Sequence, residues 1–122
     1  MRQAALLHKL QSGDPRTLPA ADVLAMATRE GAAALGMEKI IGSLEPGKRA
    51  DLIVVSMNAA RQTPMYDPLS HLVYTTRGDD VRTTIVNGKI LMREGRVLTL
   101  NESAVLAEAR KLAADVRQAV GK

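Results

Sequence analysis

Apolar residues recur at helical spacing in the first third of the chain. A short helix is expected over residues 2–10, and the loop at 11–19 carries glycine and two prolines that separate it from an alanine-rich helical stretch over 20–35. We expect Gly31 to divide that stretch into two helices. Gly36 is placed to close the second helix in a left-handed conformation.

The pattern changes from helix to strand after this stretch. Residues 45–47, Glu-Pro-Gly, suit a type II turn in which the glycine supplies a positive φ. The segment 50–56 has a continuous apolar centre, which predicts a strand covered on both faces. Asp67 and Pro68 form the N-cap and first-turn pair of a short helix that continues to Tyr74.

A β-hairpin is the clearest local signal. Strand-forming residues at 81–86 and 89–92 flank Asn-Gly at 87–88, a pair that satisfies the two positive φ values of a type I′ turn. Glu-Gly at 94–95 repeats this turn and leads to a third short strand at 96–98. Three consecutive antiparallel strands are therefore expected.

The chain is expected to end in a long amphipathic helix. Thr99, with Glu102 three residues later, predicts a capping box, and the helix is expected to continue to about Val120. Apolar residues at intervals of three or four form one stripe along it. They are Val105, Ala109, Leu112, Val116 and Val120.

Composition limits the possible classes of protein. A chain of 122 residues holds one domain at most, which would bury about two-thirds of its unfolded surface. The absence of cysteine excludes disulfides and thiolate metal sites, and no apolar stretch is long enough to span a bilayer. We therefore expect a cytoplasmic protein with no membrane partner. The net charge is +4, but basic residues are scattered and only two aromatic residues are present, so no nucleic-acid partner is expected.

The expected strands form an α+β protein whose sheet does not close. The strand at 52–55 needs a neighbour on each edge, and the strands between 81 and 98 can supply only one side. An independent domain normally covers or charges such an apolar edge. We therefore expect that this chain is a piece of a larger protein. On its own it is expected to self-associate through the exposed sheet edge.

No catalytic, cofactor-binding or metal-binding residue is assigned in this chain. His8 and His71 are the only histidines, too few for a catalytic zinc without acidic ligands at a suggestive spacing. Ser70 beside His71 is not a nucleophile and base pair, because neighbouring helical side chains point in different directions. Lys48 directly follows the expected turn at 45–47, and its surroundings indicate a structural turn. Asp51 is expected to accept hydrogen bonds from the backbone of that turn.

Several motifs together resemble the amidohydrolase superfamily. Residues 42–55, GSLEPGKRADLIVV, resemble a signature near the C-terminus of that family, and 18–36 resemble the helices before it. Asp-Pro with His-Leu-Val-Tyr within 67–74 and Val-Asn-Gly-Lys at 86–89 are similar to the branch of chlorohydrolases, guanine deaminases and 5-methylthioadenosine/S-adenosylhomocysteine deaminases. Residues 2–9 are most similar to the last group.

The resemblance implies a parent three to four times as long, with a (β/α)₈ barrel, a small β-sandwich and a divalent metal, zinc or iron. Its metal ligands have no counterpart here, so no cofactor is expected in this chain and the missing N-terminal part is the expected partner. The implied segments are the final barrel helices (1–36), a sandwich strand and connection (37–66), a returning helix (67–79), the sandwich hairpin and third strand (80–98) and the C-terminal helix (99–122).

The implied function is that of a C-terminal segment of a metal-dependent hydrolase. The parent would be a hydrolytic deaminase or dechlorinase that acts on C–N or C–Cl bonds of a purine- or triazine-like ring, and the segment alone would be inactive. One alternative is a standalone α+β interaction or scaffold module, which an open reading frame without upstream barrel sequence would favour. Another is a weak basic nucleic-acid binder, whose binding would fall steeply with salt.

Overall fold

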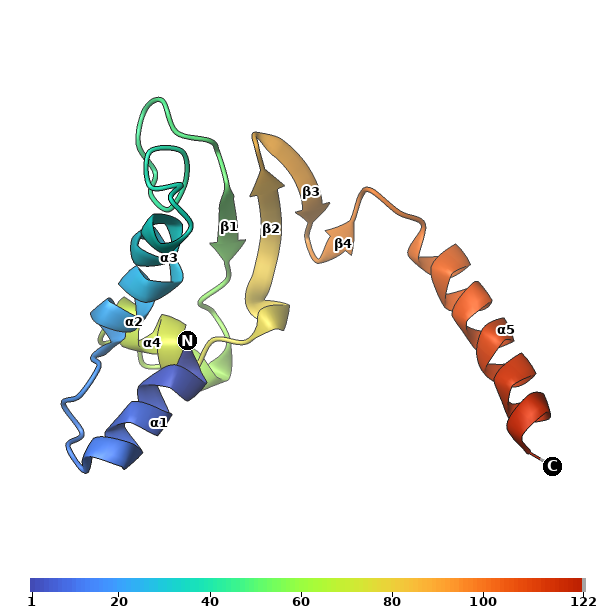
Figure 1. The fold of residues 1–122 in the computed structure, drawn as a ribbon, viewed down its shortest axis with the longest axis horizontal. Helices are drawn as coiled ribbons and strands as arrows, with labels where there is room; N and C mark the ends of the chain where they lie inside the picture. The colour runs from blue at the N-terminus through green and yellow to red at the C-terminus, as the bar shows by residue number, and fades with distance from the viewer. Residues whose placement is uncertain (122) are drawn as a thin grey trace.

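The computed structural model describes residues 1–121, and it is an α+β structure (Figure 1). The helices are α1 (Arg2–Ser12), α2 (Ala20–Ala27), α3 (Arg29–Ala34), α4 (Pro68–Tyr74) and α5 (Glu102–Val120). The strands are β1 (Leu52–Val55), β2 (Val81–Val86), β3 (Lys89–Arg93) and β4 (Arg96–Val97), and two 3₁₀ turns are η1 (Ala60–Gln62) and η2 (Gly78–Asp80).

The four strands form one antiparallel sheet in the order β1-β2-β3-β4. Leu52 lies opposite Ile85, and Met92 of β3 lies between Thr84 of β2 and Val97 of β4. In the described part of the chain, no strand pairs with the outer edge of β1. The expected open sheet edge is therefore present.

Both turns of the sheet have the geometry that their sequences predict. Asn87 and Gly88 have φ values of 49° and 76°, and Glu94 and Gly95 have values of 48° and 75°. Because both central residues of each turn have positive φ, the turns follow the right-handed twist of their strands. The hairpin and the third strand are confirmed.

Helices α1, α2 and α4 pack together beside the sheet (Figure 1). Their contact is built from small side chains: the buried cluster consists of Ala5, Ala20, Val23 and Val73, with Leu18 and Tyr74 against it. The predicted start of α4 is confirmed, because the Asp67 carboxylate accepts hydrogen bonds from the backbone N–H groups of Leu69 and Ser70. This cap satisfies donors that a helix start leaves unpaired.

The break between the second and third helices falls at Thr28, so the expectation of a break at Gly31 is wrong. The Thr28 hydroxyl donates to the carbonyl of Leu24 at 2.7 Å, and the backbone leaves the helical region with φ −124° and ψ −99°. Gly31 lies inside α3, where a Cβ would meet the Met26 carbonyl at 2.9 Å. The absence of a side chain at Gly31 therefore permits the close approach of α3 to α2 after the break. Gly36 has the expected left-handed φ, 66°.

The long final helix is present, but its cap is not the predicted one. Asn101 is the N-cap, and its side-chain oxygen accepts a hydrogen bond from the N–H of Ala104 at 3.1 Å. The expected capping box of Thr99 and Glu102 is wrong, because the helix begins two residues later than that box requires. The helix lies apart from the rest of the chain, and none of its residues is buried (Figure 1).

The core is much smaller than the length predicts. The accessible surface is 9379 Å², whereas a compact protein of this mass exposes about 6,400 Å². About half of the unfolded surface is buried, so the expected two-thirds is wrong. The strand at 52–55 is likewise not covered on both faces, since Ile53 and Val54 are 54% and 50% exposed.

Glycine substitutions test the turn geometry. Gly88→Ala should cost about 1–2 kcal/mol, because the left-handed backbone penalises a Cβ even in open space. Gly42→Ala should cost more, because its φ is +92° and the added Cβ would lie 2.6 Å from that of Ala32. Gly78→Ala is the matched control, with open space and no positive φ. Urea unfolding measures all three, and equal losses would contradict the assignment.

Self-association tests the open edge of β1. We expect the chain to form oligomers, because the unpaired edge of β1 can pair with a strand of a second copy. Ile53→Lys, which places a charge on the edge strand, should weaken association at least about tenfold. Leu7→Lys, at an apolar site on α1 that is 62% exposed against 54% for Ile53, is the control. Sedimentation equilibrium gives the constants, and equal effects of the two substitutions would contradict pairing through β1.

Candidate functional site

The two histidines lie on different helices and do not form a metal centre. His8 is exposed on α1, whereas His71 is half-buried on α4 with its Nδ1 3.3 Å from the Thr75 hydroxyl. Among residues 1–121, no group of three or more histidine, aspartate or glutamate side chains is placed to hold a metal ion. The residues present in this part of the chain therefore do not fit a catalytic metal.

The other polar residues considered from sequence take part in local structure. The Ser70 hydroxyl donates to the capping carboxylate of Asp67, and Lys48 donates to the Ser43 hydroxyl at 2.6 Å. Asp51 accepts a hydrogen bond from the backbone N–H of Asn87. The expectation that Asp51 serves the turn at 45–47 is therefore wrong, because the pairing of β1 with β2 brings it to the hairpin turn.

A buried glutamine organises the connection after β1. Gln62 is 1% exposed, and its Oε1 accepts a hydrogen bond from the N–H of Ala59 at 3.0 Å. Its Nε2 donates to the hydroxyl of Thr76 at 3.3 Å and to the carbonyl of Ser56 at 3.4 Å. A buried amide must be satisfied in this way, so Gln62 holds the ends of β1 and α4 together.

A charged pair lies next to this glutamine. The Arg61 guanidinium donates to both carboxylate oxygens of Asp80 and, through Nε, to the carbonyl of Thr75 at 3.2 Å. The backbone N–H of Arg77 donates to Asp80 at 2.8 Å, and this bond, followed by that from Arg61, lowers the pKa of the Asp80 carboxyl. Every bond joins groups of the chain itself, so the pair fixes the loop rather than presenting a free acid or base.

The Arg61 and Gln62 cluster was not predicted from sequence. Arg61 and Asp80 are 19 residues apart, and each stands in a polar connection without a recognisable motif. Only the return of α4 to the start of β2 brings them together. No local sequence signal could have identified this pair.

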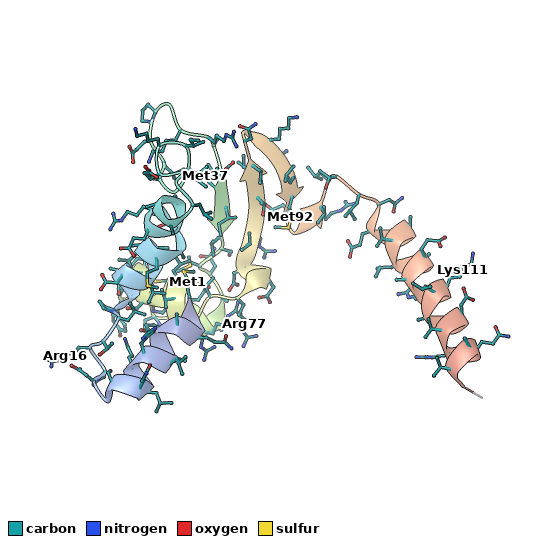
Figure 2. All side chains as sticks on the ribbon, viewed as in Figure 1. Met1, Arg16, Met37, Arg77, Met92 and Lys111 are labelled. Carbon is teal, nitrogen blue, oxygen red and sulfur yellow. The ribbon has the colours of Figure 1, made fainter. Side chains whose placement is uncertain are left out.

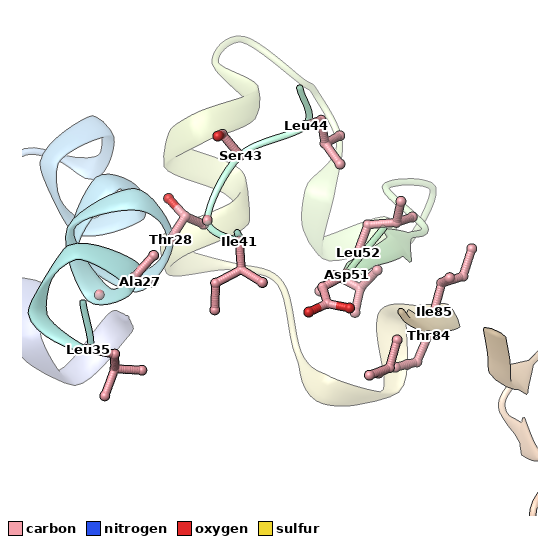
Figure 3. A pocket seen from close by; sticks show the side chains of 15 residues that line it. Ala27, Thr28, Leu35, Ile41, Ser43, Leu44, Asp51, Leu52, Thr84 and Ile85 are labelled. Carbon is pink, nitrogen blue, oxygen red and sulfur yellow. The ribbon is translucent and has the colours of Figure 1, made fainter. Parts of the chain in front are cut away.

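An apolar groove lies between the helices and the sheet. Its volume is about 660 Å³, and Figure 3 shows Leu35 and Ile41 on one side and Leu52 and Ile85 on the other. Asp51 is the one acidic lining residue, and its carboxylate already accepts a backbone N–H. Ligand pockets carry a few convergent polar groups, and of the lining hydroxyls here those of Thr28 and Ser43 already donate to Leu24 and Glu45. The groove is better suited to apolar protein surface.

The comparisons with known proteins place the chain in a family. The model of the amidohydrolase family matches residues 1–91. The chain therefore belongs to the amidohydrolase family, and the resemblance seen in its motifs is confirmed.

The relatives found include purine nucleoside deaminases. The chain is 53% identical over 116 residues to the 5′-deoxyadenosine deaminase of Methanosarcina acetivorans, a match that covers 95% of this chain and 26% of that protein. It is 44% identical over 120 residues to the 5-methylthioadenosine/S-adenosylhomocysteine deaminase 1 of Syntrophus aciditrophicus, covering 98% and 27%. The chain spans about a quarter of the length of these relatives.

Solved structures show the same arrangement of elements. An adenosine deaminase from Xanthomonas campestris with bound zinc matches with a TM-score of 0.88 and 35% identity, over 96% of this chain and 27% of that chain. The atrazine chlorohydrolase of Arthrobacter aurescens complexed with zinc matches with a TM-score of 0.77 and 30% identity, over 91% and 25%. Both matches again concern a minor part of a longer protein.

The role of Asp80 is tested by acid. Its pKa is lower in the folded chain than its ordinary 3.8, so its contribution to stability is present above that value and is lost as the pH falls through the folded pKa. Asp80→Asn should lower the urea midpoint at neutral pH and flatten its fall in acid. Asp79→Asn, an exposed carboxylate 3.9 Å from Arg61, should leave both unchanged. Parallel acid profiles for all three proteins would contradict the role.

Proposed function

We propose that this chain is the C-terminal quarter of a metal-dependent hydrolase that removes an amino group from a purine-like ring. In this reaction water replaces the amino group at a ring carbon, and ammonia leaves. The observation that carries the proposal is the match of nearly the whole chain, at 53% identity, to a quarter of a 5′-deoxyadenosine deaminase. Removal of chloride from a triazine-like ring is the second candidate, favoured by the fold match to a chlorohydrolase at 30% identity.

The reacting groups lie outside this chain in our proposal. Matched structures of an adenosine deaminase and an atrazine chlorohydrolase contain zinc, yet the described residues here offer no group of side chains able to hold a metal. The preceding part of the full-length protein therefore supplies the metal site. This segment supplies packing surfaces, and it orients the elements of the preceding part that carry the reacting groups.

The segment is assigned to two parts of the parent. Residues 1–36 form the last helices of a (β/α)₈ barrel, and 67–79 return to them. Residues 37–66 and 80–98 form half of a small β-sandwich, which strands from the N-terminal part of the parent complete. The open edge of β1 and the apolar groove of about 660 Å³ support this assignment, because no strand among residues 1–121 pairs with that edge and the groove between the helices and the sheet is left unfilled by them.

A chimeric enzyme tests the proposal. The matched quarter of the Methanosarcina acetivorans enzyme is replaced by this chain, and ammonia release from 5′-deoxyadenosine is measured. We expect a rate within about tenfold of the unaltered enzyme, a loss of at most about 1.4 kcal/mol of transition-state stabilisation. A chelator should abolish it. The 122-residue chain alone should release no ammonia above a blank.

The controls separate assembly from chemistry. The Methanosarcina enzyme lacking its matched quarter should be inactive, because the surfaces that this quarter covers are exposed. A folded chimera without activity, beside an active unaltered enzyme, would contradict the proposal. Ammonia release by the 122-residue chain alone would contradict the placement of the reacting groups.

A further inference from the structure

Helix α5 is the element that the rest of the chain leaves uncovered. It is 19 residues long, and none of them is buried. Figures 1 and 2 show it standing away from the sheet, with its side chains, Lys111 among them, free of the other elements. In proteins most of the stability of a helix comes from the packing of its amphipathic face rather than from helix propensity, and α5 has no such packing within the described chain.

One face of α5 is apolar and broad. The stripe consists of Val105, Leu106, Ala109, Leu112, Val116 and Val120. At 100° per residue they span about 120° of the helix circumference. The five larger side chains are between 44% and 76% exposed. A stripe of this width suits packing on the surface of a globular body, whereas a two-stranded coiled coil uses a narrower seam.

Charges border this stripe in two rows of opposite sign. Arg110 and Arg117, seven residues apart, lie along one side, and Glu108 and Asp115, also seven apart, lie along the other. Side chains seven apart share a helix face. A surface that receives this face would have an apolar centre with acidic groups beside the arginines. On the other side Lys111 lies within i,i+3 and i,i+4 reach of Glu108 and Asp115 on the helix itself.

The position of α5 recurs in a solved structure. The match to the Xanthomonas campestris deaminase covers 96% of the 122 residues and leaves about five outside, so most of α5 is aligned together with the sheet and the other helices. Contacts within this segment do not hold α5 there, because no residue of it is buried. A body outside the segment must fix the helix in that protein.

The surface leading to α5 is apolar as well. Val97 at the end of the sheet is 41% exposed, and Leu98 and Leu100 in the connection are 58% and 50% exposed. Apolar surface therefore continues from the sheet through the connection to the stripe. One large body can cover all three, and the relatives have about three-quarters of their length outside the match.

We infer that α5 clamps the segment to the preceding part of the same polypeptide, which receives the apolar stripe between its two charged rows. A tether makes this contact intramolecular, with an effective concentration in the millimolar range that a second copy of the chain does not reach. The inference rests on the proposed function in one respect, because it requires that the chain is part of a longer amidohydrolase.

Hydrogen exchange on the 122-residue chain is the first arm of the test. The amides of α5 should exchange with protection below about tenfold. This value should stay the same when the protein concentration is raised, even where the chain self-associates through β1. Protection that rises with concentration would show that a second copy covers the stripe and would overturn the inference.

The second arm uses the chimera described above. Its α5 amides should be protected at least about a hundredfold. Leu112→Asp should remove that protection and lower the thermal midpoint, with the molecular mass by light scattering unchanged. Ala114→Asp, on the opposite face of α5, is the matched control and should have neither effect. Leu112→Ala provides a milder change with the same expected direction.

Three results would overturn the inference. They are weak protection of α5 in the folded chimera, equal effects of the substitutions at 112 and 114, and a fall in molecular mass with Leu112→Asp, which would place a second copy on the stripe. Failure of the proposed function is distinguishable, because a chimera without ammonia release can still protect α5.

Discussion

The burial of apolar surface is the constraint on which this structure depends. The buried hydrophobic side chains are all alanine or valine, and the surface exceeds that of a compact protein of the same mass by about 3,000 Å². Large apolar side chains are exposed on β1 (Ile53 and Val54), on α1 (Leu6, Leu7 and Leu10) and along α5. The fold thus arranges surfaces for another body more than it encloses a core of its own.

Polar contacts keep these surfaces in place where a core cannot. Gln62 and the pair of Arg61 and Asp80 join the end of β1 to the end of α4 and the start of β2. Asp51 fixes the hairpin turn beside the groove. These bonds fix the loops that join the sheet to the helices. In an amidohydrolase this would allow the segment to support a site that it does not contain.

Local signals in the sequence predicted most elements, and tertiary contacts account for the rest. Asn87-Gly88 and Asp67-Pro68 act within one turn, so the hairpin and the start of α4 could be read directly. The break at Thr28 could not, because the glycine at 31 serves a close approach between helices rather than a helix end. The cluster around Gln62 had no sequence signal. The family was evident from its motifs, whereas the covering expected for β1 is missing within the described chain.

Small-angle X-ray scattering from the 122-residue chain, extrapolated to zero concentration, tests this account most directly. A compact protein of that length has a radius of gyration of about 14 Å. We predict a clearly larger value for the monomer, because α5 and the apolar faces find no partner within the chain. A radius near that of a compact domain would show that the chain covers its own apolar surface and would contradict the account.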